Sequence, residues 1–471
     1  MSKPKNNKQE IDEISVLNTV SQDEIQQSDT ARIDTRRTKE EMELLSKIEQ
    51  NSVALETIAD SAIGVQAYNR SKHTEEQIEN RVFHSDKQES EDHLPQISGK
   101  DVSRYSIEFD GETWIQYGEH LHDCRDIRYL SGPRILVRQI PAKGRHKIQA
   151  GYAEETYCNY NTVLNVLSDD EESPIRYILA VLNSSLMSWV FPRKANSVVT
   201  DSFPKLSVVD LERIPIQRIT GDADDGNLQE LRENQDSLLH SSGFQPGTKS
   251  KPVLRDYLPF LTSTVENAKK QRKNLNLQLG DHLGTYADGP TLAAVGFTQP
   301  AEGVAESMLH ETTETRSKLG ITEVSVEREG PNALTVSVAV RYKPDDPGAY
   351  ETDANGYRYV DSIEALRVTD LTEREADLVE SFVPVAVADE LGGFRKTAAK
   401  TISPMDRLEA LTLPAVEDVA GGLAQYRETE ERAAELDAKI ERTDDLIDEI
   451  VYELYGLTDE EIEIVEEAVG D

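Results

Sequence analysis

The segment Arg134 to Lys147, RILVRQIPAKGRHK, is the part of the sequence best suited to bind a polyanion. It carries five Lys or Arg side chains and His146, and it has no carboxylate. The whole chain of 471 residues has 51 Lys and Arg against 88 Asp and Glu, a formal net charge of −37. Cations with few acidic neighbours can contact phosphate oxygens, and Arg can also read guanine through two hydrogen bonds. The segment therefore favours nucleic-acid binding over the usual fate of a charge run, which is pairing with local acids in solvent.

Side-chain alternation predicts a strand at the start of this segment. Successive side chains of a strand point to opposite faces of the sheet. One face would hold Ile135, Val137 and Gln139, and the other Arg134, Leu136, Arg138 and Ile140. Pro141 would end the strand, and the following AKGRHK would form a flexible loop with three cations. We expect these charges on a strand edge and its loop, where they can face DNA.

A second group of residues has types that could hold a metal ion. HLHDC places His120, His122 and Cys124 at alternate positions, which share one face if the segment is a strand. A zinc site needs a fourth ligand, and only Cys158 or a distant His could supply it. Closed zinc sites normally show paired ligand spacings. The sequence therefore favours polar loop residues here, and we predict no metal site.

Sequence motifs for catalysis are not found. The chain has no Gly-rich turn of the dinucleotide- or phosphate-binding kind. It also lacks the (Asn/Asp)-Pro-Pro-aromatic loop and the Gly-containing loop for S-adenosylmethionine that an adenine-specific DNA methyltransferase needs. No acid…Glu-x-Lys pattern suited to a magnesium-dependent nuclease is present. We predict no catalytic residue in this chain, and a complete enzyme with an unrecognised site is the least favoured hypothesis.

Composition indicates a globular protein of more than one domain with a very polar surface. Hydrophobic residues make up 37% of the chain, and the mean hydropathy is −0.56. Two cysteines and the absence of an apolar N-terminal segment predict a cytoplasmic protein without membrane association. The acidic residues are spread along the chain, which favours a salt-adapted, halophilic protein over an acidic tail for basic partners. At molar salt the Debye length is about 3 Å, so DNA binding would depend on close contacts.

The predicted fold class is α+β, in which a β-rich region precedes a long helical pair, or coiled coil, that carries an inserted small α+β domain. Turn residues, charge runs and changes of periodicity give the boundaries. The predicted order is a disordered tail at 1–36, the β-rich region at 37–220, a loop and helical spacer at 221–289, the inserted acidic domain at 290–400 and a C-terminal heptad helix at 401–471.

The heptad pattern is the clearest periodicity in the sequence. Apolar residues recur seven apart, with two further positions three residues after their neighbours: Ala433, Leu436, Ile440, Ile447, Ile450 and Leu454. Such a seam must lie against another helix. We expect an antiparallel pair with the helical run at 253–279, and a partner protein is the alternative.

Several further motifs suggest a family. GVQAYNRSKHTEEQIENRVFHS, ISGKDVSRYSI, WIQYG, GPRILVRQIP, YNTVLNVL, YILAVLNSSLMSWVF and FPKLSVVDLERIPIQ follow one another in the order typical of the TaqI-like C-terminal specificity domain. The chain resembles that domain over residues 45–220 and, in its closing helix, over 430–467. The domain is the target-recognition part of type IIG restriction–modification enzymes, which join an adenine-specific methyltransferase to DNA recognition in one chain.

The resemblance implies that Gly64 and the loop through His73 approach DNA, and that Asn183 belongs to the scaffold. A helix C-cap at Gly64 and a partly buried aromatic at Tyr68 are the alternatives. Together with the cationic segment and the basic residues near it, the predicted DNA-binding residues are Gln66, Tyr68, Arg70, Lys72, His73, Lys100, Arg104, Arg125, Arg128, Arg134, Arg138, Lys143, Arg145, Lys147, Arg193 and Lys194.

The resemblance further implies sequence-specific recognition of double-stranded DNA within a restriction–modification system. Because the methyltransferase domain expected before the recognition domain is missing, we expect either a separate specificity subunit or a truncated remnant. S-adenosylmethionine, with magnesium as a further candidate, would then belong to a partner methyltransferase or restriction chain. The alternative function is a protein-interaction scaffold that uses the heptad helix and the acidic domain.

Overall fold

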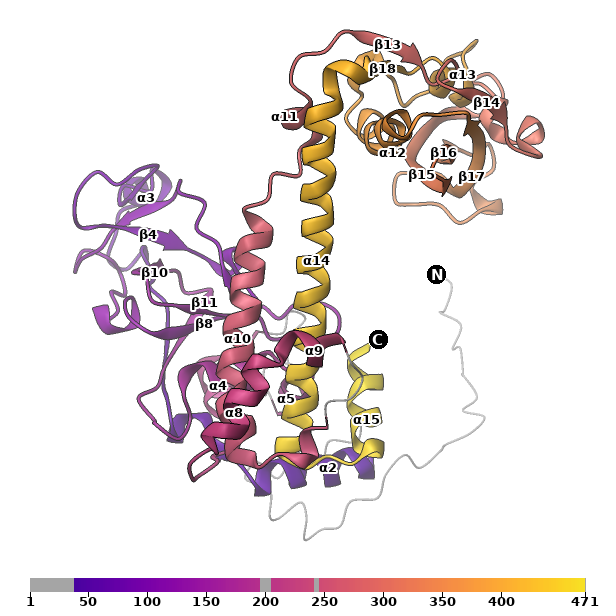
Figure 1. The fold of residues 1–471 in the computed structure, drawn as a ribbon. Coiled ribbons are helices and arrows are strands. Elements are labelled where there is room, and N and C mark those ends of the chain that lie inside the picture. The colour runs from indigo at the N-terminus through magenta and orange to yellow at the C-terminus, as the bar shows by residue number, and fades with distance from the viewer. Residues whose placement is uncertain (1–37, 195–204, 241–244, 471) are drawn as a thin grey trace, which may run out of the picture. The chain divides into compact units, whose positions relative to one another are not determined.

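The computed structural model describes residues 38–194, 205–240 and 245–470, so the predicted tail at 1–36 lies outside the described residues. The chain forms two compact units (Figure 1). Unit 1 comprises Met1–Gln271 and Leu436–Asp471, and unit 2 comprises Arg272–Glu435. Both contain helices and sheets, which confirms the α+β class. Unit 2 begins before the expected boundary at 290 and ends inside the helix expected from 401.

An antiparallel sheet forms the centre of unit 1. Its strands are β2 (Asp60–Ile63), β11 (Val163–Leu167), β8 (Arg134–Arg138) and β9 (Ala150–Ala153), in that order. The alternation predicted for β8 is present, because Ile135 and Val137 join one core cluster while Leu136 joins another. The expected edge position is wrong. β8 pairs with β11 on one side and with β9 on the other, so it is an internal strand.

Smaller sheets cover the region around this centre. A four-stranded sheet has the order β10 (Cys158–Asn159), β4 (His93–Ile97), β7 (Trp114–Gln116) and β3 (His84–Ser85). Two-stranded pairs join β1 (Val53–Ala54) to β12 (Pro215–Ile216) and β5 (Val102–Ser103) to β6 (Ser106–Ile107). On one face of β8, Leu136 shares a core cluster with β4 and β5 residues. On the other face, Ile135 and Val137 share a cluster with helical residues of α4 and α5, so little of β8 reaches solvent.

Two short helices replace the single apolar helix expected near Asn183. α4 (Ile175–Asn183) and α5 (Ser185–Lys194) are separated by Ser184, whose backbone is extended and whose hydroxyl donates to the Val181 carbonyl. Each residue from Tyr177 to Phe191 is buried. Asn183 donates to and accepts from Ala150 of β9, which agrees with the expected scaffold role.

The first helix, α2 (Lys39–Gln50), begins at the predicted capping box of Thr38 and Glu41. It ends well before Gly64, so the helix C-cap considered for that glycine is wrong. The remaining short helices of unit 1 are α3 (Glu75–Glu79), α7 (Val208–Glu212), α8 (Asp225–Glu233) and α9 (Gln235–His240).

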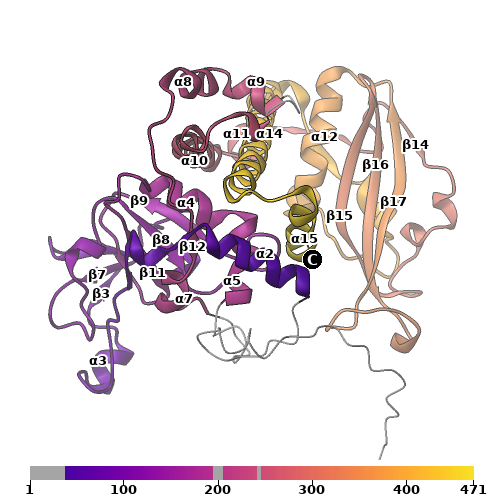
Figure 2. The same cartoon turned by 90° about the horizontal axis from the view of Figure 1, so that it is seen from below.

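Long helices complete unit 1. α10 (Lys251–Lys273) runs beside, and antiparallel to, the C-terminal part of α14 (Val416–Tyr455), as Figures 1 and 2 show. Buried residues of both helices belong to one core cluster with α4, α5 and the central sheet. This arrangement confirms the helical pair; a supercoil stays a prediction. The expected single helix at 401–471 is wrong, because Gly456, at φ +69°, separates α14 from α15 (Asp459–Gly470).

Unit 2 is built on one antiparallel sheet covered by a helix. The strand order is β14 (Phe297–Pro300), β17 (Arg358–Thr369), β16 (Ala333–Lys343) and β15 (Ser317–Gly330). β15 and β16 form the hairpin that the GPN turn predicts. α12 (Glu373–Ala388) packs on one face (Figure 2). Shorter elements are α11 (Leu279–Leu283), β13 (Asp288–Thr291), α13 (Pro404–Glu409) and β18 (Thr412–Pro414).

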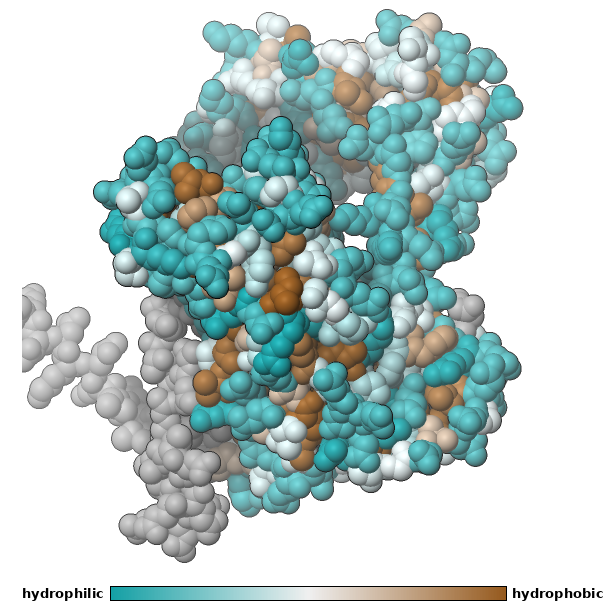
Figure 3. Space-filling view, turned by 90° about the vertical axis from the view of Figure 1, so that its left-hand side faces the viewer, coloured by the Kyte–Doolittle hydropathy of each residue, from teal (hydrophilic) through white to brown (hydrophobic). Residues whose placement is uncertain are grey.

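Hydrophilic residues cover most of the face drawn in Figure 3, and apolar residues show between them in small groups. Within the described ranges, no helix combines the length and the apolar character that crossing a membrane requires.

Gly64→Ala tests whether the fold requires the close approach of the Gly64 backbone to the backbone of residues 159–160. A Cβ at this position would overlap the carbonyl oxygens of Asn159 and Tyr160. We expect a loss of about 1–3 kcal/mol in the free energy of unfolding, measured by urea titration. Gly280→Ala is the control, because nothing lies within 4 Å of a Cβ there and the residue is helical. Unchanged stability in Gly64→Ala would contradict the approach.

Candidate nucleic-acid interface

Arg134 occupies the interior of unit 1. Its side chain is fully buried, and Nη1 donates to the Gly132 carbonyl at 2.9 Å. Within the described part of the chain, Nε and Nη2 have no hydrogen-bond partner. Burial lowers the pKa of Arg134 to about 10. The prediction that Arg134 faces DNA is therefore wrong, since the internal position of β8 withdraws the side chain from solvent.

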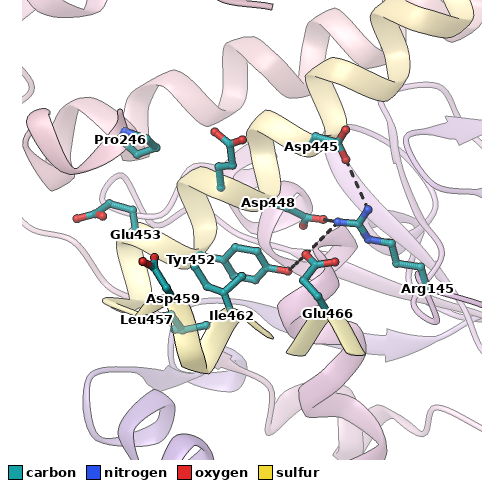
Figure 4. A pocket seen from close by; sticks show the side chains of 11 residues that line it. Arg145, Pro246, Asp445, Asp448, Tyr452, Glu453, Leu457, Asp459, Ile462 and Glu466 are labelled. Carbon is teal, nitrogen blue, oxygen red and sulfur yellow. Dashed lines mark hydrogen bonds and ion pairs between the residues drawn. The ribbon is translucent and has the colours of Figure 1, made fainter. Parts of the chain in front are cut away.

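Arg145 lies in the loop between β8 and β9 and is tied to the C-terminal helices (Figure 4). Its guanidinium lies 3.6 Å from Asp445, 3.2 Å from Asp448 and 3.1 Å from Glu466. Nε also donates to the Ser185 hydroxyl at 2.9 Å. A flexible loop with free cations is therefore wrong for Arg145, because carboxylates of α14 and α15 hold it.

Asp448 is the buried acceptor at the centre of these contacts. It accepts hydrogen bonds from the Ser185 hydroxyl at 2.6 Å and the Ser185 amide at 2.8 Å. Burial acts to raise the pKa of this carboxyl. The nearby His146 ring, with Nε2 3.6 Å from the carboxylate, and the hydrogen bonds from Ser185 outweigh burial and hold the pKa below its usual range. Asp448 therefore remains charged inside the protein and fixes the loop to α14.

Arg104, in the β5–β6 turn, also pairs with a carboxylate of α14. It donates to both carboxylate oxygens of Asp444, each at 2.6 Å, and to the Asn183 carbonyl. The two ion-paired side chains are only 11% and 14% exposed. Burial tends to lower the pKa of Arg104, but Tyr105 and Asp444 outweigh it and raise the value. The Arg104 guanidinium therefore binds α14 and the α4–α5 junction. The prediction that Arg104 contacts DNA is wrong.

Ser185, His146 and Asp448 resemble a hydrolytic triad in composition but not in geometry. The serine hydroxyl lies 3.2 Å from His146 Nε2, yet it donates directly to Asp448. His146 Nδ1 faces Arg104 at 3.0 Å instead of a carboxylate. A triad needs the carboxylate on the far ring nitrogen and the serine proton on the histidine. The cluster therefore serves as a structural ion network.

Other predicted cations are also paired with acids of unit 1. Arg193 pairs with Glu41 of α2, and Lys194 lies 2.7 Å from Glu49 of the same helix. The pairs of Arg125 with Asp123, at 2.8 Å, and of Arg128 with Asp60, at 2.7 Å, are more exposed. Arg193 and Lys194 hold α2 against α5, whereas Arg125 and Arg128 could exchange these partners for phosphate.

The loop from Gln66 to His73 is ordered by contacts with residues 119–125. Gln66 exchanges backbone hydrogen bonds with Asp123, and His73 is buried with Nε2 2.8 Å from the His120 carbonyl. Lys72 donates to the carbonyls of Glu119 and Leu121. Lys72 is exposed apart from these contacts, and Arg70 extends furthest into solvent, with its side chain 87% exposed and 3.7 Å from Glu75.

Tyr68 belongs to a small aromatic cluster under that loop. Its ring stacks on Phe83 with the centroids 5.1 Å apart. Its hydroxyl accepts from the Phe83 amide and lies 2.9 Å from His84 Nδ1. Burial, with a smaller effect from Arg81, lowers the pKa of His84 to about 4. Tyr68 is therefore a half-buried packing residue, the alternative considered for it.

Three further cations lie at or near the end of β8: Arg138 is its last residue, Lys143 lies in the loop that follows, and Lys100 lies in the turn before β5. We call Lys100, Arg138 and Lys143 the β8-end cations. A Cβ at Gly99 would lie 3.5 Å from Arg138 Cγ, so the backbone just before Lys100 passes Arg138. Among the described residues no acid pairs with Arg138 or Lys143, and Lys100 is 74% exposed with acids at 3.7 and 3.9 Å.

Lys147 differs from the β8-end cations. Its amide donates to Ser188 of α5, and burial followed by the charge of Arg193 lowers the pKa of its amine. The predicted single island of cations is thus divided. Some cations anchor helices and Arg134 is interior, whereas Lys100, Lys143 and Arg70 are exposed and Arg138 is half-buried.

The contribution of Asp444, Asp448 and Lys269 was not apparent from the sequence. Lys269 of α10 donates to the Arg104 carbonyl at 2.6 Å. Asp444 and Asp448 stand four residues apart and flank the apolar Ile447. That spacing places two carboxylates on one helix face beside the heptad seam. It is the one feature of the sequence that could have pointed to these residues.

The HLHDC residues are not assembled as a metal site. His120 Nε2 lies 2.9 Å from the Gln116 carbonyl, and both cysteines are free thiols. Over the residues described, no group of three or more His, Cys, Asp or Glu side chains is placed to hold a metal ion.

Asp448→Asn tests the ion network. Because the pKa of Asp448 is lowered by folding, its stabilisation is present above about pH 4 and lost as the pH falls through the folded value. We expect a loss of about 3 kcal/mol in unfolding free energy at pH 7, the low end for a buried pair because Arg145 is partly exposed. Urea titrations should show a smaller difference between variant and wild type at pH 3.

Asp445→Asn is the matched control in the same cluster. Burial, together with Asp444 and Asp448, raises the pKa of Asp445 against the attraction of Arg145. Folding therefore disfavours its charged form, and neutralising it should cost little at pH 7. Equal losses in both variants would contradict the central position of Asp448.

Part of the sequence is similar to a known restriction enzyme. The relative is a putative type II restriction enzyme and methyltransferase of Methanocaldococcus jannaschii, 28% identical over 179 residues. The match covers 37% of this chain and only 14% of that relative.

Solved structures align more broadly but distantly. The type I restriction–modification S subunit from M. genitalium covers 86% of this chain and 96% of its own, with 8% identity and a TM-score of 0.38. The HsdS subunit from Thermoanaerobacter tengcongensis covers 86% and 95%, with 9% identity and a TM-score of 0.26. These values are too low to support a functional argument.

One family model matches part of unit 1. It is described as the TaqI-like C-terminal specificity domain, and the match runs over residues 94–216. The matched residues include the central strands β8, β9 and β11, the α4–α5 pair and all three β8-end cations. Residues 94–216 therefore hold a TaqI-like C-terminal specificity domain, as the sequence motifs predicted.

Proposed function

We propose that unit 1 recognises a specific sequence of double-stranded DNA as the specificity part of a restriction–modification system. The observation that carries this proposal is the match of residues 94–216 to a specificity domain. The β8-end cations lie inside the matched segment and include Arg138, which no acid of the described residues pairs with. An acidic surface elsewhere would repel DNA and favour this approach.

Arg138 is the side chain best placed for the proposed contact. It ends an internal strand and is held on both sides, because it pairs with Val163 of β11 and bonds to Gln149, the residue before β9. Its amide donates to the Gln149 carbonyl at 2.9 Å. A side chain on such a rigid base loses little additional backbone freedom when it binds. Arg138 can donate two hydrogen bonds to guanine, while Lys100 and Lys143 contact phosphates.

Adenine methylation in the proposed system is carried by a partner methyltransferase chain. S-adenosylmethionine would bind that partner, and magnesium would be required there if cleavage accompanies methylation. Two observations support this division of labour. No methyltransferase motif occurs in this sequence. The Methanocaldococcus jannaschii relative, whose name combines a restriction enzyme with a methyltransferase, is matched over only 14% of its length.

A methyl-transfer assay with labelled S-adenosylmethionine tests that division. Purified chain alone should incorporate no label into duplex DNA, and addition of a methyltransferase subunit encoded beside it should give incorporation at one sequence. Incorporation by the chain alone would refute the partner requirement and leave sequence recognition intact.

Neutralising the β8-end cations tests the proposed interface. A variant that combines Lys100→Gln, Arg138→Gln and Lys143→Gln should bind more weakly at all salt concentrations. The ligand is the DNA duplex that the wild-type chain enriches from a random pool. The slope of log affinity against log salt should become shallower by roughly 0.9 for each phosphate that the variant no longer neutralises. Fluorescence anisotropy over a KCl series measures both quantities.

The matched control removes three exposed cations elsewhere: Lys39→Gln, Arg374→Gln and Lys400→Gln. Because both triple variants change the net charge equally, only the first should alter the salt slope. Equal weakening would show that net charge, not the β8-end cations, governs binding. Absence of any enriched sequence in a duplex selection would refute specific recognition itself.

A further inference from the structure

A cavity of about 600 Å³ opens between α14 and α15 in unit 1 (Figure 4). α14 supplies residues 445–453, α15 supplies residues 459–466, and Leu457 lies in the turn between the helices. Pro246 of the segment before α10 closes one side. The positive φ of Gly456 folds the two helices back on each other and so creates the hollow.

The cavity joins apolar surface to a ring of negative charge. Its apolar lining consists of Pro246, Leu457, Ile462 and the ring of Tyr452, whose hydroxyl donates to Glu466 at 2.6 Å. Its carboxylates are Asp445, Asp448, Glu449, Glu453, Asp459 and Glu466, and its one cation is Arg145.

Some carboxylates that line the cavity have a cationic partner and others have none among the described residues. Arg145 pairs with Asp445, Asp448 and Glu466, so its guanidinium neutralises the carboxylates on one side of the cavity. In the part of the chain that the structure describes, Glu449, Glu453 and Asp459 have no cationic partner. Burial and the neighbouring Asp445 raise the pKa of Glu449, as expected for a carboxylate crowded by others. A cation entering the cavity would relieve this repulsion.

We propose that this α14–α15 cavity docks a basic amphipathic segment of a partner polypeptide. Lys and Arg combine an aliphatic stem with a charged head, so the stem can lie along Leu457 and Ile462 while the head meets Glu449, Glu453 or Asp459. Apolar side chains beside them on the same helix face would fill the space next to Tyr452 and Pro246. DNA is excluded from this cavity by the same carboxylates.

The inference goes beyond DNA recognition and does not depend on it. The β8-end cations lie in the 3-10 turn η2 (Gly99–Asp101), in β8 and in the loop after β8, whereas the cavity is lined mainly by α14 and α15. Variants of one site can therefore be tested without altering the residues of the other.

The experiment measures binding of a fluorescent Leu/Lys amphipathic peptide to the full chain. The cavity variant combines Glu449→Gln, Glu453→Gln and Asp459→Asn, which keep side-chain size. The control variant combines Glu43→Gln, Glu463→Gln and Glu467→Gln, exposed carboxylates outside the cavity lining. Equal urea midpoints for both variants establish that folding is retained.

We expect the cavity variant to bind the Leu/Lys peptide roughly tenfold more weakly, and the control variant to bind as the wild type does. Carbodiimide cross-linking should join peptide lysines to Glu449, Glu453 or Asp459. Equal weakening in both variants would overturn the proposal by showing diffuse attraction to an acidic surface. Complete displacement of the peptide by equimolar spermine would overturn it in favour of a polyamine site.

Discussion

The ion pairs between the β-rich region and α14 are the interaction on which unit 1 depends. Arg104 meets Asp444, and Arg145 meets Asp448, one helical turn apart on the same helix. Asp448 also accepts two hydrogen bonds from Ser185 at the start of α5. Sheet, apolar helices and C-terminal helix are thus joined at one point. The buried charge of Asp448 is tolerated there because donors of Ser185 and Arg145 bond to its carboxylate oxygens.

This use of charge changes the interpretation of the cationic segment. Five cations in fourteen residues indicate a binding surface if they all face outward, but their positions relative to the sheet differ. Arg134 lies inside, Arg145 holds helices, and Lys143 is exposed while Arg138 is half-buried without an acidic partner among the described residues. A segment of uniform charge therefore has three structural roles. The proposed DNA contact uses only the cations that the protein itself does not neutralise.

The fold was more predictable from sequence than the site was. Local patterns predicted the alternation of β8, the Thr38 capping box, the β15–β16 hairpin and the buried heptad positions. Each of these depends on residues close in sequence. The spacing of Asp444 and Asp448 marks two carboxylates beside the heptad seam, but Arg104 and Arg145 lie about three hundred positions away, so no local pattern could show that they pair. Strand order likewise decided that β8 is internal, and pairing between distant strands is not encoded in a single strand.

The composition of unit 1 from two separated stretches of chain has a consequence for biosynthesis. A ribosome completes the 272–435 unit before the second stretch, beginning at Leu436, emerges. Until then the apolar faces of α4, α5 and α10 lack their covering helix, and Arg104 and Arg145 lack their carboxylates. The core of unit 1 therefore stays incomplete during synthesis until the stretch that begins at Leu436 has emerged.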